Sequence, residues 1–334
     1  MSKTPAETGE ERLIAKYFAP IARHPGALRL SDDAAMLTPP AGCDLVLTKD
    51  AIVAGVHFFP DDPADAVARK ALRVNLSDLA AKGAPPAGFL LALALPDHVT
   101  DAWLAAFAQG LGADADAYAC PLLGGDTVKT PGPLMVSITA FGFVPQGRMV
   151  HRRGAKPGDR IIVTGTVGDA SLGLRIRSDA DAARRWNLDD GSRAHLLGRY
   201  LLPQPRSALA ELVQTHASAA LDVSDGLAGD LAKLCRTSGV TAQIDVARVP
   251  LSDAARTALA AEPALIETIL SGGDDYEIVC AVPAARSDAF IAAAQAAGVP
   301  AADIGRVMAG EGAPSFLGEG GRPLSLRQTS FSHF

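Results

Sequence analysis

The stretch ADAVARKALRVNLSDLAAKGAPPAGFLLALALP, Ala64 to Pro96, predicts a helix that is followed at once by a buried strand. Its first half places apolar residues at helical spacing, at Val67, Ala71, Val74 and Leu79. Gly83 and the two prolines after it end this pattern, as such residues commonly end helices. The apolar run FLLALAL then shows no polar alternation, which is typical of a strand covered on both faces. A helix and strand joined in this way favour a fold in which helices pack on a sheet.

Helices and strands are predicted to alternate along the rest of the chain. In the first half, we expect helices over 9–22 and 101–119, with Thr100 as a cap, and strands over 43–50 and 134–144. In the second half, we expect strands over 160–165, 220–225 and 275–282 and helices over 205–219, 226–239 and 285–298. The passage PQGRMVHRRGAKPGD separates the halves and has the composition of a linker. The predicted fold is therefore α/β (α+β) with two domains, residues 1–148 and 149–334.

The composition is that of a globular chain. It has 334 residues, 48% of them hydrophobic, and a formal net charge of -6. An acidic chain lacks the basic surface of a general nucleic-acid binder. The longest apolar run, residues 89–95, is too short to span a bilayer, and the start MSKTPAETGEER has no signal-peptide core. We expect a cytoplasmic protein that binds neither nucleic acid nor membrane, with its four separated cysteines reduced.

Aspartates stand repeatedly at the ends of apolar, strand-like runs, namely Asp32, Asp33, Asp50, Asp126, Asp222, Asp225, Asp274 and Asp275. Asp78 instead lies late in the predicted helix, one turn after Asn75 and on the same face. Any one of these residues could be a turn or capping residue, and that is how we interpret Asp275. Carboxylates that converge repel one another unless a cation neutralises them. The set therefore favours a site for Mg²⁺, which binds oxygen ligands and commonly shares them with substrate phosphates.

Several other signals leave alternatives open. No P-loop, Rossmann fingerprint, zinc-binding histidine motif or serine-hydrolase elbow is present in the sequence. The glycine-rich TGTVGDASLG, residues 164–173, follows a strand and predicts backbone N–H groups near an anion. His57 is either a packed histidine or a ligand-binding one. Two similar pairs of short motifs occur along the chain: LSD and LGGD, which end at Asp78 and Asp126, and VSD and SGGD, which end at Asp225 and Asp274. The similarity indicates either an internal duplication or a coincidence of short motifs.

Taken together and in order, the motifs resemble those of thiamine-monophosphate kinases. The matching stretches are GEERLIAKYFAPIA, DDAAML, DAIVAGVHF, KALRVNLSDLAAKGAPP, LLGGDT, RRGAKPGDRIIVTGTVGDASLGL, DVSDGLAGDL, SGGDDYEIV and FSHF. They cover essentially the whole chain. The family belongs to a superfamily of ATP-using enzymes that includes aminoimidazole ribonucleotide synthetase and selenophosphate synthetase.

The resemblance implies both a fold and an activity. It implies a two-domain subunit of the aminoimidazole ribonucleotide synthetase type, without a P-loop, that forms a homodimer through its N-terminal domain. It implies ATP-dependent phosphorylation of thiamine monophosphate to thiamine diphosphate, the last step in making that cofactor. Several Mg²⁺ ions and ATP are implied, with K⁺ as a further candidate cation. The alternatives are a sister ATP-dependent enzyme of the superfamily and a diverged nucleotide-binding protein with weak activity.

The resemblance also implies roles for single residues. The implied metal ligands are Asp33, Thr48, Asp50, Asp78, Asp126, Asp222 and Asp225. The implied ATP contacts are Tyr118, Gly125, Asp126, Arg152 and Ser224. The implied substrate contacts are His57, Asp274 and Gln328. The implied catalytic groups are the metal-bound aspartates and Arg152.

Four positions depart from the family pattern. Residues 28–33, LRLSDD, stand where the family has Gly-x-Gly before the acids, so we expect a different backbone there. Lys49 stands where the family has a small hydroxyl residue, and its ammonium would replace a metal, reach a phosphate or point to solvent. Asp274 stands where the family has a glutamate, and Gln328 stands where an aromatic residue is common. We expect these changes to alter affinity and to leave the reaction class intact.

The chemistry of such a reaction explains why no catalytic base is apparent. The nucleophile is the substrate's own phosphate, whose second pKa of about 6 leaves it largely dianionic at neutral pH. The obstacle is the repulsion between that phosphate and the γ-phosphoryl group of ATP. Mg²⁺ bridging the phosphates would remove much of it and align an in-line transfer, and Arg152 would offset charge in the transition state. We therefore predict direct transfer without a phosphorylated enzyme.

Overall fold

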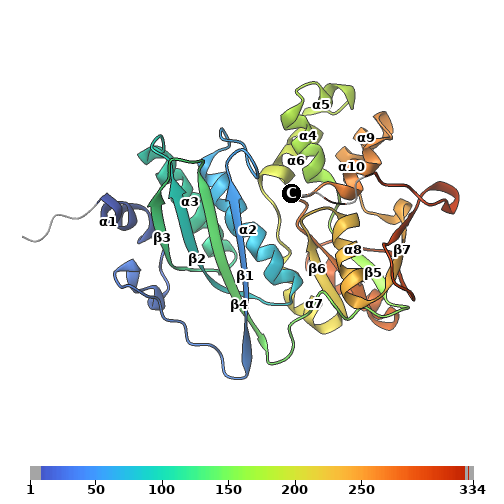
Figure 1. Ribbon diagram of the computed structural model, residues 1–334, viewed down its shortest axis with the longest axis horizontal. Coiled ribbons are helices and arrows are strands. Elements are labelled where there is room, and N and C mark those ends of the chain that lie inside the picture. Colours follow the sequence, from blue (N-terminus) through green and yellow to red (C-terminus); the bar gives the residue numbers. More distant parts are fainter. Residues whose placement is uncertain (1–8, 328–329, 331–334) are drawn as a thin grey trace, which may run out of the picture. The chain divides into compact units, whose positions relative to one another are not determined.

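The computed structural model describes residues 9–327 and 330 of the chain (Figure 1). The described chain forms two compact units. The first unit contains residues up to 75 together with 86–145, and the second contains 76–85 together with the residues from 146 onward. The second unit thus begins at the boundary passage and also takes the last turns of one helix, which no feature of the sequence had signalled. In the described residues, no helix is long and apolar enough to cross a membrane.

The first unit is built on a four-stranded sheet in the order β1-β4-β2-β3. The strands are β1 (Cys43–Val53), β2 (Pro86–Leu95), β3 (Leu122–Lys129) and β4 (Met135–Pro145). Only the β2–β3 pair is parallel. Helices α2 (Ala64–Ala81) and α3 (Asp101–Ala117) lie against one face of the sheet (Figure 1). The helix–strand unit predicted from residues 64–96 is confirmed, and so is Thr100 as the α3 cap, since its side chain accepts the Trp103 N–H.

The N-terminal part of the first unit is less regular than predicted. The expected helix over 9–22 is a short α1 (Gly9–Leu13) that continues as a π-helical turn, Ile14–Phe18. A 3₁₀ segment, Pro25–Leu30, follows. Phe18 packs edge-to-face on Phe107 of α3, with the ring centroids 6.4 Å apart. This apolar contact holds the segment against the unit and brings the residues after it towards the sheet.

The second unit contains a six-stranded sheet in the order β10-β7-β9-β5-β8-β6. The strands are β5 (Arg160–Thr164), β6 (Ala219–Val223), β7 (Thr241–Asp245), β8 (Glu277–Val282), β9 (Ala301–Met308) and β10 (Ser315–Leu317). All pairs are antiparallel except β10–β7. The strands expected over 160–165, 220–225 and 275–282 are confirmed as β5, β6 and β8. The two-domain α/β (α+β) fold class is confirmed.

Helices surround the second sheet. They are α4 (Asp169–Ser178), α5 (Ala182–Arg185), α6 (Asp190–Leu201), α7 (Ala210–His216), α8 (Leu227–Ser238), α9 (Asp253–Ala261), α10 (Leu265–Ser271) and α11 (Ser287–Ala296). One apolar cluster joins the sheet to α4 and α8 and includes Val279, Leu172 and Leu231, all fully buried. A second cluster covers the other face, where Ile278 packs with Phe290 of α11. Alternate residues of β8 thus enter different cores, which explains why this strand is apolar throughout.

Three consecutive residues of the first unit have a strained backbone. Leu28, Arg29 and Leu30 have φ values of 50°, 56° and 58°, in the left-handed region that glycine adopts without strain. They fall in the stretch where the resemblance led us to expect Gly-x-Gly and where a different backbone was predicted. The strain is held immediately before Asp32 and Asp33, where packing of the flanking apolar residues must compensate for it.

Arg29→Gly should stabilise the protein because it removes this strain from an exposed position. We expect its free energy of unfolding to exceed that of the matched Arg29→Ala variant by about 1 kcal/mol. Urea denaturation of both variants measures the difference. Equal stability of the two variants would contradict the left-handed conformation at residue 29.

Candidate active site

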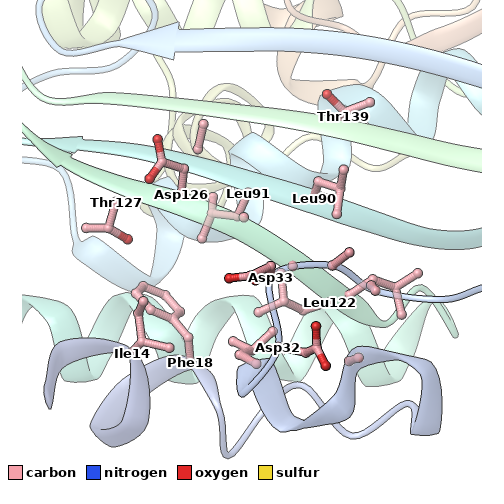
Figure 2. A pocket seen from close by; sticks show the side chains of 18 of the residues that line it. Ile14, Phe18, Asp32, Asp33, Leu90, Leu91, Leu122, Asp126, Thr127 and Thr139 are labelled. Carbon is pink, nitrogen blue, oxygen red and sulfur yellow. The ribbon is translucent and has the colours of Figure 1, made fainter. Parts of the chain in front are cut away.

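A cavity of about 760 Å³ opens in the first unit, between the N-terminal segment and the sheet. Asp32 and Asp33 enter it from the segment, and Asp126 enters it from β3 on the other side (Figure 2). The three carboxylates are exposed, and the structure gives them no hydrogen-bond or ion-pair partner among the described residues. Lys49 of β1 and Ser137 of β4 also line the cavity. The arrangement leaves three acid groups available to a ligand.

The register of the sheet separates the predicted metal ligands of this unit. Ala51, Ser137, Ala92 and Asp126 are neighbours across the four strands, so their side chains share one face. Lys49 lies two residues before Ala51 and therefore also points to this face. Thr48 and Asp50 alternate with Lys49 and point to the opposite face, where Asn75 of α2 accepts the Asp50 N–H at 3.0 Å. Sequence reasoning placed Asp50 and Asp126 at strand ends, and this is wrong, because both lie within strands.

Two predicted nucleotide contacts of the first unit have a defined structural setting. Gly125 lies in β3, where an added Cβ would come within 2.0 Å of the Leu91 carbonyl oxygen. Glycine is therefore required here for close approach of β2 and β3. Tyr118 ends α3, and its ring lies under the Arg73 guanidinium, whose carbon is 5.7 Å from the ring centroid. Arg73 in turn forms an ion pair with Asp114, at 2.5 Å.

His57, the predicted substrate contact of the first unit, sits in a tight turn after β1. Its Nδ1 accepts the Val53 N–H at 3.0 Å, and its own backbone N–H donates to the Val53 carbonyl. Gly55 enables the turn with a φ of 80°. The ring is therefore orientated by the backbone, and its Nε2 is the nitrogen directed away from this bond.

In the second unit, the end of α2 meets the end of β6. Ser77 is buried and donates its hydroxyl to Asp222 at 2.9 Å. Burial raises the pKa of Asp222 well above its usual range, and the nearby charges of Asp78 and Asp230 raise it further. The predicted metal ligands Asp78 and Asp222 are thus brought together, as the sequence interpretation requires. A carboxylate in this position gains from any added cation.

The loop after β6 carries two more predicted residues, Ser224 and Asp225. Asp230 of α8 is buried and accepts both of their backbone N–H groups, at 3.0 and 2.9 Å. Lys233, one turn further along α8, contacts Asp225 at 2.5 Å and Asp230 at 2.8 Å. The loop is therefore held in a fixed conformation by α8. Asp230 and Lys233 were missed from the sequence, although their helical spacing within DVSDGLAGDLAK could have indicated them.

Lys82 is a further residue that sequence reasoning missed. It follows α2 and donates to the Ala220 carbonyl at 2.7 Å, beside the strand that carries Asp222. Burial lowers the pKa of Lys82 to about 8, Asp222 and Asp78 oppose this effect, and Arg152 adds to it. Lys82 and the predicted Arg152 therefore supply positive charge close to the acid pair. The only signal in the sequence was a lysine one turn after Asp78.

In the loop SGGDDYE, residues 271–277, the glycine pair predicts a bend made by the glycines themselves, and the structure differs. The residues with positive φ are Asp274, at 72°, and Tyr276, at 51°. The glycines instead allow close packing: a Cβ on Gly273 would lie 2.5 Å from the Ser224 carbonyl oxygen, and one on Gly272 would lie 2.3 Å from Ser171. Aspartate tolerates the left-handed region better than most side chains, which suits a shorter acid at position 274.

Backbone bonds join this loop to the loop after β6. The Asp274 N–H donates to the Ser224 carbonyl at 2.9 Å, and the Tyr276 N–H donates to the Val223 carbonyl at 2.8 Å. The predicted substrate residue Asp274 is thus fixed beside the predicted nucleotide and metal residues Ser224 and Asp225. Gln328, the third predicted substrate residue, lies outside the described residues.

Asp275 is fully buried beneath the loop. Its carboxylate accepts the Gly168 N–H at 2.7 Å and the Ala170 N–H at 3.3 Å, both at the start of α4. Burial raises its pKa well above the usual range, while the Gly168 bond lowers it. The interpretation as a capping residue is confirmed, although the capped helix is distant in sequence. The anion predicted for residues 164–173 is therefore the protein's own carboxylate.

Glu277 is a second buried carboxylate under the loop, and sequence reasoning missed it. It accepts hydrogen bonds from Thr164 at 2.8 Å, from Arg199 at 2.9 Å and from Arg206. Arg199 also donates to the Asp275 carbonyl at 3.2 Å. A Cβ on Gly165 would overlap Glu277, so this position has to remain glycine. Two guanidinium groups thus compensate the charge of Glu277.

The first residue of α4, Asp169, joins three elements of the second unit. It is buried and accepts bonds from Thr166 at 2.6 Å and from Ser252, the N-cap of α9, at 2.5 Å. His195 of α6 contacts it at 3.0 Å. The hydrogen bond to Asp169 raises the pKa of His195, although partial burial opposes it. Burial would raise the pKa of Asp169, but the bonds from His195, Ser252 and Thr166 lower it overall.

The predicted site residues therefore form two groups. The first unit holds Asp33, Thr48, Asp50, His57, Tyr118, Gly125 and Asp126, and the second holds Asp78, Arg152, Asp222, Ser224, Asp225 and Asp274. Among the described residues, no three acidic, histidine or cysteine side chains converge closely enough to form a metal site on their own. The donor set still suits a hard cation, because the cavity carboxylates have no internal partner and Asp222 is crowded by like charges.

Comparisons with known proteins agree with this geometry. The family model described as AIR synthase related protein, N-terminal domain, matches residues 31–144, and its C-terminal counterpart matches residues 156–315. A thiamine-monophosphate kinase of Caulobacter vibrioides is 47% identical over 311 residues, which cover 91% of this chain and 85% of that protein. These matches define the class as AIR synthase related.

Solved structures narrow the class. The thiamine-monophosphate kinase of Stenotrophomonas maltophilia K279a is 39% identical, with a TM-score of 0.79 over 87% of this chain and 90% of that one. A structure described as AaThiL complexed with AMPPCP and TMP is 30% identical, with a TM-score of 0.77 over 91% of each chain. The chain belongs to the thiamine-monophosphate kinase family.

The His195–Asp169 pair makes stability depend on pH. The pKa of His195 is raised in the folded protein, so the pair stabilises fully below about pH 6.5 and is lost as pH rises through the folded pKa. We expect His195→Gln to lower the melting temperature by more at pH 6 than at pH 9. The exposed His98→Gln is the control and should show no such difference. A loss for His195→Gln that is the same at both pH values would contradict the pairing.

Proposed function

We propose that the chain transfers the γ-phosphoryl group of ATP to thiamine monophosphate, which gives ADP and thiamine diphosphate. One observation carries this proposal: the chain is closely related, over most of its length, to thiamine-monophosphate kinases. A related structure described as complexed with AMPPCP and TMP supports both substrates, since AMPPCP is an unreactive analogue of ATP. The reaction is the last step in making thiamine diphosphate, and a cytoplasmic location is part of the proposal because ATP is the co-substrate.

The proposal assigns Mg²⁺ to the carboxylates of both units, with K⁺ as a further cation. The metal ligands would be Asp33, Thr48, Asp50, Asp78, Asp126, Asp222 and Asp225. The unpartnered cavity acids and the crowded Asp222 support this assignment. When bound, Mg²⁺ would lower the repulsion between the two substrates by neutralising their phosphate oxygens.

The chain's own residues would bind and orient the substrates. Tyr118, Gly125 and Ser224 would contact ATP, and His57 and Asp274 would contact thiamine monophosphate. Arg152 would stabilise the charge that spreads over the transferring group. Lys82 lies close enough to Arg152 for the two positive charges to interact. No side chain has to remove a proton, because the attacking phosphate is already largely dianionic. We therefore propose direct in-line transfer.

We also propose a homodimer that forms through the first unit. The sheet face opposite the helices exposes Leu45, Leu47 and Leu90, and Leu47 retains 61% of its accessible surface. These residues lie in β1 and β2, and their neighbour Phe141 of β4 pairs with Leu47 across the strands. Apolar groups gathered on a sheet face are commonly covered by a partner. A second copy of the chain would cover them.

Incubation of the purified protein with ATP, Mg²⁺ and thiamine monophosphate tests the reaction. We expect thiamine diphosphate and ADP in equal amounts, separated by liquid chromatography, and none without Mg²⁺. Formation of ADP without thiamine diphosphate would contradict the proposal. So would labelling of the protein by [γ-³²P]ATP alone, because direct transfer has no phosphorylated enzyme.

Asp126→Asn tests the metal assignment in the first unit. The amide keeps the shape but removes the charge that would hold a cation, so we expect kcat to fall by about 100-fold or more. The melting temperature should change little, because Asp126 is exposed. Asp97→Asn is the matched control, an exposed surface acid that pairs with Lys129. Full activity of Asp126→Asn would remove this residue from the site.

A further inference from the structure

We infer that Lys49 binds the phosphates of the nucleotide and provides a permanent positive charge in the first-unit cavity. The inference rests on the proposed function, and it concerns a residue to which neither the resemblance nor the comparisons assign a role. Of the described residues that line the cavity, Lys49 is the only basic one, and it shares the lining with the three acids Asp32, Asp33 and Asp126. Without it, the lining would carry only negative formal charge and would repel a polyphosphate.

The position of the Lys49 ammonium is fixed by β4. Its Nζ donates to the Ser137 hydroxyl, and that hydroxyl donates onward to the Asp50 carbonyl at 3.2 Å. Because the Ser137 hydroxyl donates its hydrogen to the Asp50 carbonyl, its oxygen accepts from the ammonium through a lone pair. The lysine side chain is therefore held over the sheet and does not extend away from it. Two of its three N–H bonds remain available to a ligand.

The sheet sets the separation between Ser137, which holds this ammonium, and Asp126. Ser137 and Asp126 lie in the same cross-strand row, with Ala92 of β2 between them. Two strand spacings separate them by about 10 Å. These are backbone separations, and the hydrogen-bond partner of the Lys49 ammonium is the Ser137 hydroxyl, in the strand next to β1. An extended anion with several phosphate groups would reach both the ammonium and a cation held by Asp126.

The chemistry of lysine fits this role. An ammonium is a compact point charge that commonly binds phosphate oxygens. Lys49 is exposed, so its single bond to Ser137 adds little to the stability of the fold. The side chain gains a full charge-assisted interaction only when an anion enters the cavity. Its contribution should be greatest when Mg²⁺ is absent, because no other positive charge then lines this face.

Binding of AMPPCP in EDTA, measured by isothermal titration calorimetry, tests the inference. We expect Lys49→Met to weaken this metal-free binding by roughly 10-fold or more, the range of a lost hydrogen bond to a charged group. Lys49→Arg should bind within about 3-fold of the natural chain, because the charge is kept. Lys129→Met, at the exposed end of β3, is the matched control and should have no effect.

Adenosine separates phosphate binding from a structural role. It lacks phosphates, so its affinity should be the same for the natural chain and for Lys49→Met. Unchanged AMPPCP binding by Lys49→Met in EDTA, no AMPPCP binding by the natural chain, or an equal loss of adenosine affinity would each overturn the inference. A natural chain that binds AMPPCP through Lys49 but forms no thiamine diphosphate would instead refute the proposed function and leave this inference standing.

Discussion

The buried carboxylate of Asp275 is the constraint on which the site of the second unit depends. A polar group with no access to water needs hydrogen bonds within the protein, and the start of α4 provides them through the Gly168 and Ala170 N–H groups. Arg199 holds the carbonyl of the same residue and ties it to Glu277. With Asp275 fixed on both sides, the residues before and after it take the strained left-handed conformation. Asp274 is thereby directed by the scaffold before any ligand arrives.

The acidic residues of the two units differ in exposure and in their partners. In the first unit the cavity carboxylates are exposed and unpartnered among the described residues, with Lys49 as the one cation on the lining. In the second unit Asp222 and Asp230 are buried, Asp225 is half-buried, and all three have built-in partners: Ser77 and Lys82 near Asp222, and Lys233 on Asp225 and Asp230. Open acids can exchange one cation for another, whereas enclosed acids keep a fixed geometry. The proposed phosphoryl transfer would use both properties, because a nucleotide with its cation would have to enter and leave a rigid frame.

Much of the fold followed from the sequence, because its strongest signals are long and local. The helix over 64–81 and the buried strand after it are determined by apolar spacing and by Gly83. Strand β3 was expected to end at Asp126, because its sequence, LLGGDTVK, turns polar there, and pairing with β2 extends it to Lys129. The hydrogen-bond partners of the site residues could not be predicted from the sequence either. The bonds from Gly168 to Asp275 and from Arg199 to Glu277 join residues far apart in the chain. The glycine pair of SGGDDYE correctly predicts a bend. The positive φ values, however, are taken by Asp274 and Tyr276 and not by the glycines.

Amide hydrogen exchange in the ligand-free protein tests most directly whether the scaffold alone fixes this loop. The amides of Asp274 and Tyr276 donate to the carbonyls of Ser224 and Val223. If buried Asp275 holds the loop in place, both amides should be protected, by NMR, to nearly the same degree as those of strand β8. Exchange at the rate of an open surface loop, with protection appearing only when ATP or thiamine monophosphate is added, would show that the ligands and not the scaffold organise the site.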